Sequence, residues 1–424
     1  MRNGVISLLT ITLIVALLIG AFVFQEAVIN KFSTPQIISQ PENMEIKWNE
    51  NEGLSEENLK NVANASAIFG IELLKNLSNK NGNILISPLS IWLAMAMLYE
   101  GANGSTAKEI ARVMHFPENK SLLRENINWF LENFANHSEN YTLKIANSLW
   151  VQEGFPIKER YVEILKKYYY TYFQLLNFFE NSEYARKIIN MWIENETNGK
   201  IKDFFPPESI TSATVAVLVN ALYFHGLWAH PFNGTRTNKE YFYAPSGKIM
   251  LDMMHISREF KYTEDNDTQI LEMPYRGHNL SMLIILPKTD VLNISLDNLE
   301  KWRQNLHSVD ANVSFPKFTL DEKFGLKNML EDMGIKSVFT PSANLNDMAP
   351  GGGIFASDVI HETYVSVDEK GTEAAAATGI PIPACMPPPL KYVEFRVDHP
   401  FLFLIQDRST GAIFFMGWVE EPAE

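Results

Sequence analysis

The single cysteine of the chain, Cys385, is the residue whose type could do the most direct chemistry, because a cysteine thiolate is a strong nucleophile. A cysteine that attacks a substrate needs a positioned histidine and electropositive surroundings. Residues 380–390 contain no histidine and no charged side chain, which disfavours a cysteine hydrolase and favours a small apolar role for Cys385. One cysteine also rules out an intrachain disulfide framework and argues against a cysteine-rich metal site.

Other catalytic signatures are absent from the sequence. It has no G-x-S-x-G elbow, no H-E-x-x-H helix and no phosphate-binding loop. The glycines at 351–353 follow a proline and lack the Lys-Ser/Thr ending of such a loop. These absences disfavour a hydrolase. The net charge of −14, from 36 Lys and Arg against 50 Asp and Glu, argues against nucleic-acid binding.

Two polar residues, Asn220 and His361, stand in apolar surroundings. Asn220 interrupts the apolar run at 214–224, and His361 precedes a strand-like segment. A buried polar side chain without hydrogen bonds costs about 1–3 kcal/mol, so each residue needs a partner. The two side chains could bond to each other, or each could be satisfied locally by backbone or water, and the second arrangement is the commoner one.

The segment at 365–389 reads VSVDEKGTEAAAATGIPIPACMPPP. Its four alanines and its prolines at 381, 383 and 387–389 are typical of an extended linker exposed to proteases. Only 35 residues follow it, and they are strongly apolar. The exposed stretch therefore joins two parts of one core and not two domains.

Helices must position these residues. An apolar stripe at three- to four-residue spacing predicts a helix that buries one face, and its members are Val62, Ala65, Phe69, Leu73 and Leu77. Ser87 and Pro88 predict the N-cap and first turn of a second helix, which is apolar almost all round over 89–98 and should be buried. Thr106 and Glu109 are spaced as a capping box for a third helix.

Strands follow other patterns. The run at 214–224 predicts a strand covered on both faces, and 281–286 predicts another. The segments 401–405 and 412–419 flank a polar turn, which predicts a hairpin. Helical patterns such as 184–196 and 325–333 occur between the predicted strands. The expected fold class is mixed α/β, in a single large domain with a large, deeply buried sheet.

The N-terminus carries a run of 20 uncharged residues at 5–24, preceded by Arg2. Such a helix is about 30 Å long and crosses a bilayer core, so 1–24 is either a cleaved signal peptide or an N-terminal membrane anchor. Residues 25–57 are polar and interpreted as a linker, and 58–422 as the main domain. We expect this domain outside the cell, secreted or anchored to the outer face of the membrane.

Asparagine supports this localisation. Twelve Asn-X-Ser/Thr triplets, the acceptors of N-glycosylation, predict a glycoprotein. They begin at Asn64, Asn76, Asn103, Asn119, Asn136, Asn140, Asn195, Asn233, Asn266, Asn279, Asn293 and Asn312. The alternative is that an asparagine-rich composition produces the triplets by chance.

Eight blocks resemble the serpins, a family of suicide protease inhibitors, and they occur in serpin order over roughly 360 residues. FRVDHPFLFLI at 395–405 is similar to the C-terminal signature of the family. The other blocks are ISPLSI (86–91), LYEGANGSTAKEI (98–110), IANSLW (145–150), WIENETNGKI (192–201), VNALYFHGLW (219–228), FPKF (315–318) and DEKGTEAAAAT (368–378).

The resemblance implies a serpin fold with three β-sheets, eight or nine helices and an exposed reactive loop at about 369–390. It also implies a partner, a target serine protease, which attacks the loop as a substrate and forms a covalent acyl complex. The cut loop then inserts into the central sheet as an extra strand and distorts the protease before deacylation. The resemblance therefore implies an inhibitor that is not itself an enzyme, that needs no cofactor and no metal ion, and that is a monomer.

The resemblance also implies roles for individual residues. The loop hinge comprises Glu369, Gly371, Thr372, Glu373, Ala374, Ala375, Ala376 and Ala377. A polar cluster beneath the point where the sheet opens comprises Ser87, Ser90, Asn220 and His361. Trp228 lies near the site where the loop first inserts. These roles are conformational and not catalytic.

The inserted strand would run from 372 to 384, 13 residues or about 43 Å. Small side chains suit insertion into a covered sheet, because overpacking costs about 1–3 kcal/mol per residue. Pro381 and Pro383 count against easy insertion, because proline cannot donate to a central ladder.

Counting from Glu369 places the reactive bond at Cys385–Met386, with Ala384–Cys385 and Met386–Pro387 as alternatives. A small or medium apolar residue before the bond suits subtilisin-, elastase- or chymotrypsin-like proteases. The alternative function is a non-inhibitory serpin that acts as a binding or chaperone-like protein.

Overall fold

A computed structural model describes residues 35–38, 46–79, 82–134, 141–289, 291–372 and 392–423. Several predicted features lie outside the described residues. These are the apolar run at 5–24, the hinge residues Glu373, Ala374, Ala375, Ala376 and Ala377, the prolines Pro381 and Pro383, and the reactive-bond residues Ala384, Cys385 and Met386.

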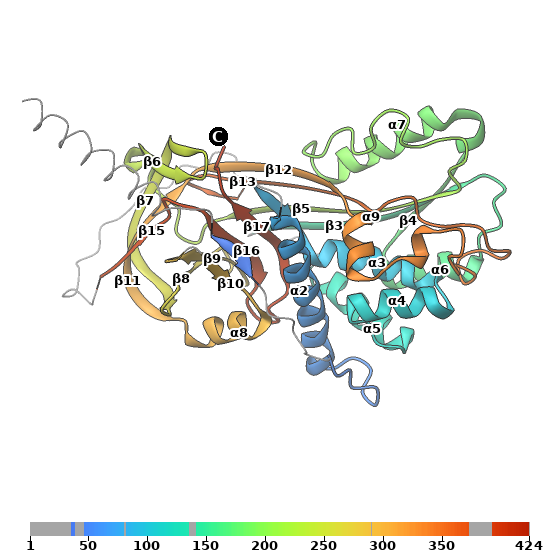
Figure 1. The fold of residues 1–424 in the computed structure, drawn as a ribbon, viewed down its shortest axis with the longest axis horizontal. Coiled ribbons are helices and arrows are strands. Elements are labelled where there is room, and N and C mark those ends of the chain that lie inside the picture. Colours follow the sequence, from blue (N-terminus) through green and yellow to red (C-terminus); the bar gives the residue numbers. More distant parts are fainter. Residues whose placement is uncertain are drawn as a thin grey trace, which may run out of the picture.

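The described residues form eight α-helices and three sheets (Figure 1). The helices are α2 (Glu56–Ser78), α3 (Pro88–Gly101), α4 (Gly104–Met114), α5 (Lys120–Phe134), α6 (Glu159–Tyr169), α7 (Phe178–Glu196), α8 (Leu296–Asn305) and α9 (Lys327–Met333). Two short 3-10 helices, η2 (Gly234–Arg236) and η3 (Ser337–Phe339), lie in connections. The predicted mixed α/β class is confirmed.

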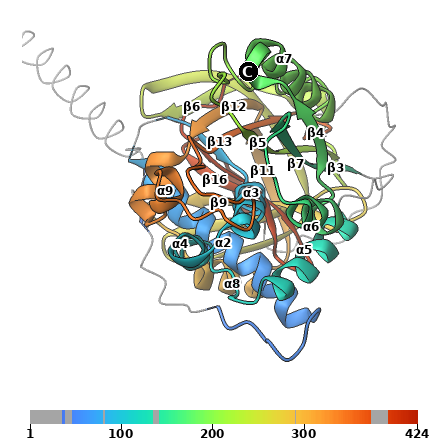
Figure 2. The same cartoon turned by 90° about the vertical axis from the view of Figure 1, so that its right-hand side faces the viewer.

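One sheet has six strands in the order β12-β13-β14-β5-β3-β4. Its strands are β3 (Tyr141–Gln152), β4 (Tyr172–Leu176), β5 (Ala216–Leu227), β12 (Phe318–Gly325), β13 (Ile360–Val367) and β14 (Gly371–Thr372). Helix α7 lies on one face of this sheet, and α3, α4, α5 and α6 lie on the other (Figures 1 and 2).

A second sheet has nine strands, of which eight follow the order β15-β11-β7-β8-β9-β16-β17-β2 and β6 pairs with β7. Its strands are β2 (Ile84–Ile86), β6 (Asn238–Ala244), β7 (Gly247–Glu264), β8 (Thr268–Pro274), β9 (Leu280–Pro287), β11 (His307–Pro316), β15 (Val393–Arg396), β16 (Phe401–Asp407) and β17 (Ile413–Val419). Every residue of β9, β16 and β17 is buried, which confirms the deeply buried sheet and the predicted hairpin.

The prediction that the run at 214–224 is covered on both faces was wrong. Burial alternates along β5, so that every second residue is only half-buried over most of the strand. Helix α7 covers one face of β5 at Val217, Val219 and Ala221, whereas the half-buried Asn220 lies on the other face and bonds to Ser90 of α3. An apolar run therefore marked the strand correctly but overstated its burial.

Helix α3 begins as predicted. The hydroxyl of Ser87 accepts a hydrogen bond from the N–H of Ser90, and Pro88 occupies the first turn. The capping box at Thr106 and Glu109 was wrong, because α4 begins earlier and Asn103 is its N-cap. Thr106 and Glu109 instead make tertiary hydrogen bonds to the segment around Ser337.

The predicted linker contributes a strand to the body. In the third sheet β1 (Gln36–Ile38) pairs in parallel with β10 (Val291–Asn293), and Ile37 is buried. Among the helices of the described residues, none is long and apolar enough to cross a membrane.

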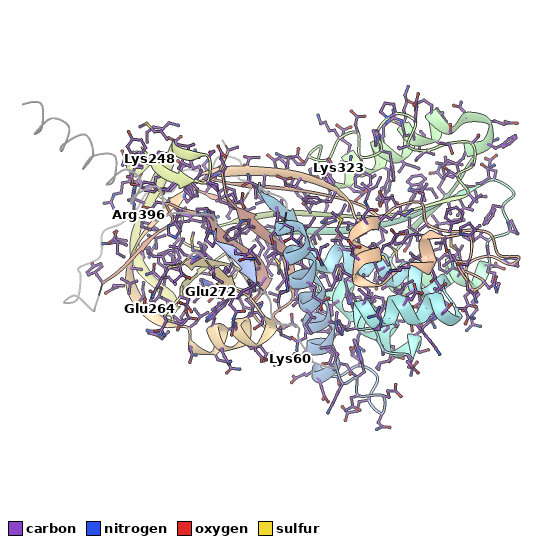
Figure 3. All side chains as sticks on the ribbon, viewed as in Figure 1. Lys60, Lys248, Glu264, Glu272, Lys323 and Arg396 are labelled. Atoms are coloured by element: carbon purple, nitrogen blue, oxygen red, sulfur yellow. The ribbon has the colours of Figure 1, made fainter. Side chains whose placement is uncertain are left out.

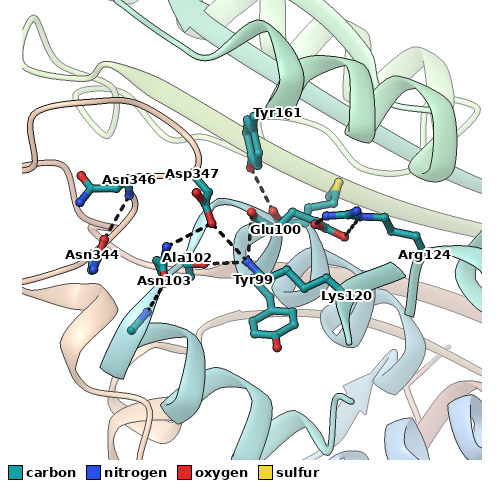
Figure 4. Close-up of polar contacts among 12 residues, drawn as sticks. Tyr99, Glu100, Ala102, Asn103, Lys120, Arg124, Tyr161, Asn344, Asn346 and Asp347 are labelled. Atoms are coloured by element: carbon teal, nitrogen blue, oxygen red, sulfur yellow. Dashed lines mark hydrogen bonds and ion pairs between the residues drawn. The ribbon is translucent and has the colours of Figure 1, made fainter. Parts of the chain in front are cut away.

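A buried ion pair joins three of the helices (Figure 4). The carboxylate of Glu100, near the end of α3, accepts two hydrogen bonds from Arg124 on α5, at 2.9 and 2.6 Å. Tyr169 on α6 donates a third, at 3.0 Å. Lys120 donates to the backbone oxygens of Glu100 and Ala102, which satisfies carbonyl groups that the end of α3 leaves open.

Candidate functional site

The first residues of the predicted loop already lie within the six-stranded sheet. Strand β14 (Gly371–Thr372) stands between β13 and β5, with Thr372 opposite Val367 on one side and opposite Gly226 on the other. Thr372 is fully buried. Gly371 and Thr372 therefore lie between two long strands of the sheet.

The local sequence makes this geometry possible. The carboxylate of Asp368 accepts hydrogen bonds from the N–H groups of Lys370 and Gly371, which closes a tight turn after β13. A Cβ at position 371 would lie 2.0 Å from the backbone oxygen of Gly226. Glycine is thus required at 371, because the two backbones approach too closely for any side chain.

Glu369 fastens the turn to the neighbouring sheet. Its carboxylate pairs with Lys317 at 3.1 Å and accepts a hydrogen bond from the hydroxyl of Thr237 at 2.8 Å. Burial alone would raise the pKa of the Glu369 carboxyl, but hydrogen bonds from its own N–H, Thr237 and Lys317 hold the pKa below its ordinary value. The residue is therefore a charged anchor at neutral pH.

Trp228 hydrogen-bonds to the turn between β13 and β14. Its indole N–H donates to the backbone oxygen of Asp368 at 3.0 Å, and its backbone N–H donates to that of Lys370 at 2.8 Å. The indole stacks on the ring of Tyr275 with the ring centroids 4.6 Å apart. The structure thus brings Trp228 together with Glu369, Gly371 and Thr372, all predicted to lie near the start of the loop.

The second predicted cluster lies at the N-terminus of α3. The backbone N–H of Ser87 donates to Nε2 of His361 at 2.9 Å, so this ring nitrogen carries no proton. Burial lowers the pKa of His361 to about 3. The imidazole is therefore neutral at physiological pH and acts as a buried hydrogen-bond acceptor on β13.

Hydrogen bonds continue from α3 into the other side of the sheet. The hydroxyl of Ser90 donates to the side-chain oxygen of Asn220 on β5. The side-chain NH2 of Asn220 donates to Oδ1 of Asn147 on β3 at 2.6 Å, and Asn147 donates to the backbone oxygen of Tyr169. Asn147 and Asn220 stand directly opposite each other in the ladder.

The N-terminus of α3 is thus hydrogen-bonded to both strands that flank β14. It contacts β13 through Ser87 and His361, and β5 through Ser90 and Asn220. Asn220 and His361 do not bond to each other: His361 is satisfied by the backbone N–H of Ser87, and Asn220 by the side chains of Ser90 and Asn147. Any separation of β13 from β5 has to strain or break this chain of bonds.

The chain that follows the loop segment joins the nine-stranded sheet. Strand β15 pairs in parallel with β11, with Val393 opposite Ala311. Arg396, at the end of β15, pairs with Glu240 at 2.6 Å and with Asp398 at 3.0 Å. Figure 3 places Arg396 at the end of the molecule opposite the helices α4 to α6. The two ends of the loop segment are therefore held by different sheets.

The sequence analysis did not identify several side chains of the site, among them Asn147, Tyr275 and Lys317. Asn147 was detectable as a polar residue in a strand-like run, IANSLW, of the same kind as Asn220. Lys317 was detectable as a charged residue within the apolar segment FPKF, because a charge that is taken out of water needs an ion-pair or hydrogen-bond partner. Tyr275 gave no signal, because an aromatic residue at the end of a strand is typical of a core. Within the described residues no group of three His, Cys, Asp or Glu could hold a metal ion.

A family model described as "Serpin (serine protease inhibitor)" matches residues 64–422 of this chain. An uncharacterized serpin-like protein of Thermococcus kodakarensis is 38% identical over 380 residues, which cover 88% of this chain and 88% of the relative. Human neuroserpin is 36% identical over 364 residues, which cover 81% of this chain and 87% of neuroserpin.

Solved structures are similar over the same extent. Uncleaved ovalbumin superposes with a TM-score of 0.75 at 28% identity and covers 85% of this chain and 100% of its own. Serpin48 of the insect Tenebrio molitor gives a TM-score of 0.75 at 30% identity, covering 88% of this chain and 100% of its own. Human thyroxine-binding globulin complexed with thyroxine gives 0.77 at 26% identity, covering 87% and 100%.

Proposed function

This chain belongs to the serpin family, and from that premise we propose that it is a suicide inhibitor of serine proteases. In this proposal the reactive loop is cut by a subtilisin-, chymotrypsin- or elastase-like protease and then inserts into the six-stranded sheet between β13 and β5. The inhibitor needs no cofactor, because the energy for trapping comes from its own refolding.

One observation carries the proposal, namely the position of β14. Thr372 already pairs with both β13 and β5, and Gly371 pairs with β5, so the first residues of the inserting strand are in place. The residues that would follow, Glu373 and the four alanines from 374 to 377, are short apart from the glutamate. Small side chains favour passage into an interior that does not tolerate overpacking.

The chemistry of the encounter is that of an interrupted peptide hydrolysis. The serine Oγ of the protease attacks the carbonyl carbon of Cys385, the bond to the nitrogen of Met386 breaks, and that amine leaves with a proton. The products are an ester between protease and Cys385 and a free amino group on Met386. Insertion of the segment at 372–384 then has to outrun the attack of water on this ester.

The test is to mix the full-length protein with subtilisin, chymotrypsin and elastase and to analyse the products on denaturing gels. We expect an adduct that survives the denaturant, with a mass equal to the protease plus the inhibitor without its C-terminal fragment. Mass spectrometry of that fragment distinguishes Cys385–Met386 from Ala384–Cys385 and Met386–Pro387. Cleaved protein without any adduct, from all three proteases, would refute the inhibitory mechanism.

A second candidate is a non-inhibitory serpin that acts as a binding or chaperone-like protein. Pro381 and Pro383 favour it, because both fall within the segment that must insert and each lacks an N–H for the ladder. In this case the same experiment gives loop cleavage with free, active protease.

We also propose that the domain acts outside the cell, secreted or anchored through residues 5–24. Ten of the twelve glycosylation triplets begin at described residues, and none of these ten asparagines is buried, which supports access to an external modifying enzyme. Fractionation of the native host with N-terminal sequencing checks this, and recovery of an unprocessed chain in the cytosol would overturn it.

A further inference from the structure

We infer that Tyr275 is a positioning residue for loop insertion, whose hydroxyl holds Thr372 as the first inserted residue between β13 and β5. The inference deepens the proposed function, because it names the contact that starts the inserted strand. Tyr275 follows β8 in the nine-stranded sheet, whereas Thr372 belongs to β14 in the six-stranded sheet. The contact therefore joins the start of the loop segment to the nine-stranded sheet.

The hydroxyl pair is short and fully enclosed. Tyr275 Oη and Thr372 Oγ1 are 2.6 Å apart, and both residues are completely buried. Burial raises the pKa of the Tyr275 phenol, so the group is protonated at any physiological pH and has a hydrogen to donate. Among the described residues, Tyr275 is the side-chain hydrogen-bond partner of Thr372.

The Tyr275 ring is fixed by its neighbours, which is what a positioning residue requires. Trp228 stacks on it with the ring centroids 4.6 Å apart, and Phe224 makes a T-shaped contact with it at a centroid distance of 4.9 Å. Its backbone N–H donates to the oxygen of Leu280 at 2.9 Å. A Cβ on Gly226 would lie 2.9 Å from the Tyr275 ring, so the glycine opposite Thr372 makes room for it.

Withdrawal of the hinge would separate the two hydroxyls. Tyr275 cannot follow Thr372 because its ring is held on both sides, so its hydroxyl would stay buried without this partner. A state in which a buried hydroxyl lacks its hydrogen bond is disfavoured by roughly 5- to 150-fold. The contact therefore biases the intact molecule toward the state in which the strand has been started, and it fixes Thr372 as the residue from which the strand grows.

The experiment compares the full-length protein with Tyr275→Phe, Thr372→Val and the double variant. Each single variant removes one hydroxyl at nearly constant shape. We expect amide hydrogen exchange in residues 366–372 to accelerate about fivefold or more in both single variants. The double variant should exchange no faster than the faster single one, because both changes break the same bond.

Two controls separate positioning from stability. Tyr161→Phe removes another fully buried hydroxyl, which donates to the backbone oxygen of Met97 at 3.0 Å, far from the loop. It should leave hinge exchange unchanged even if it lowers the melting temperature as much as Tyr275→Phe does. Thr372→Ser keeps a hydroxyl and should restore exchange close to the wild-type rate.

Equal hinge exchange in Tyr275→Phe and Tyr161→Phe, or additive effects of the two single variants, would overturn the inference. The proposed function is judged separately, by the number of inhibitor molecules consumed per protease trapped. If the wild type traps protease, that number should rise in Tyr275→Phe and Thr372→Val and not in the controls. If the wild type traps none, the inhibitory function fails, while the exchange measurement still decides the role of Tyr275.

Discussion

At the residue scale, His361 is held in a state that acid should destabilise. Burial lowers its folded pKa to about 3, whereas a histidine in an unfolded chain titrates near 6.5. At a pH between these two pKa values, the histidine is protonated in the unfolded chain but not in the folded chain. The contribution of the neutral His361 to the free energy of unfolding is therefore fully present above about pH 6.5 and is lost as the pH falls toward 3. The loss is about 2 kcal/mol at pH 5.

His361→Gln tests this, because the glutamine oxygen can still accept the hydrogen bond from Ser87 but does not titrate in this range. The fall in the free energy of unfolding between pH 7 and pH 5 should shrink by about 2 kcal/mol relative to the wild type. His307→Gln, at an exposed histidine, should leave the fall unchanged within a few tenths of a kcal/mol. Parallel pH profiles for His361→Gln and the wild type would contradict the assignment.

Residue types predicted the site only where a polar group stood out against an apolar run. Asn220 and His361 were found in this way, and the structure brings both to the N-terminus of α3. Their partners were not predictable, because a pattern reports that a hydrogen bond is needed and not which element supplies it. Tyr275 was missed for the opposite reason, since its polar atom is hidden behind an aromatic ring.

At the element scale, the Glu100–Arg124 pair decides how three helices are joined. The side chain of Glu100 is 0% exposed and that of Arg124 is 15% exposed. Arg124→Met leaves a buried carboxylate with only Tyr169 and the nearby Lys120 to stabilise it. Removing one partner of a buried pair costs about 3–5 kcal/mol, so we expect a loss of this order.

Urea unfolding followed by far-UV circular dichroism measures the loss. The matched control is Lys60→Met, which breaks the exposed pair between Lys60 and Glu300, with side-chain exposures of 60% and 31%. Exposed pairs contribute about 0–1 kcal/mol, so the control should barely move the midpoint. Similar midpoints for the two variants would contradict a large contribution of the Glu100–Arg124 pair to stability.

Element boundaries reveal what local patterns omit. The fold class and the positions of the long elements were predictable, because apolar periodicity reports burial directly. The start of α4 was not, because Thr106 and Glu109 have the types and spacing of a capping box but bond to the segment around Ser337. A local motif and a tertiary contact use the same side chains, and sequence spacing cannot separate them.

At the scale of the whole molecule, the two ends of the loop segment belong to different sheets. Thr372 lies in the six-stranded sheet, and Val393 pairs with β11 in the nine-stranded sheet. An uncut chain that inserted residues 372–384 would extend about 43 Å along the sheet. The uncut chain would then have to run back from residue 384 to the start of β15. Only eight residue steps, from 384 to 392, would be available for this distance, and fully extended they span about 27 Å. A cut in the loop removes this constraint.

This geometry predicts that the nicked protein is more stable than the intact one. Once the loop is cut, residues 372–384 can pair with both β13 and β5, apart from the two donors lost at Pro381 and Pro383. With about 1 kcal/mol per added hydrogen bond, the gain should raise the melting temperature by at least about 10 °C. Calorimetry of the protein before and after cleavage by subtilisin measures the change.

A nick engineered at the exposed glycines 351–353 is the control, and it should not raise the melting temperature, because it frees no segment for this sheet. If loop cleavage also fails to raise it, the intact fold holds no free energy that insertion could release, and a trapped protease would have no force acting on it.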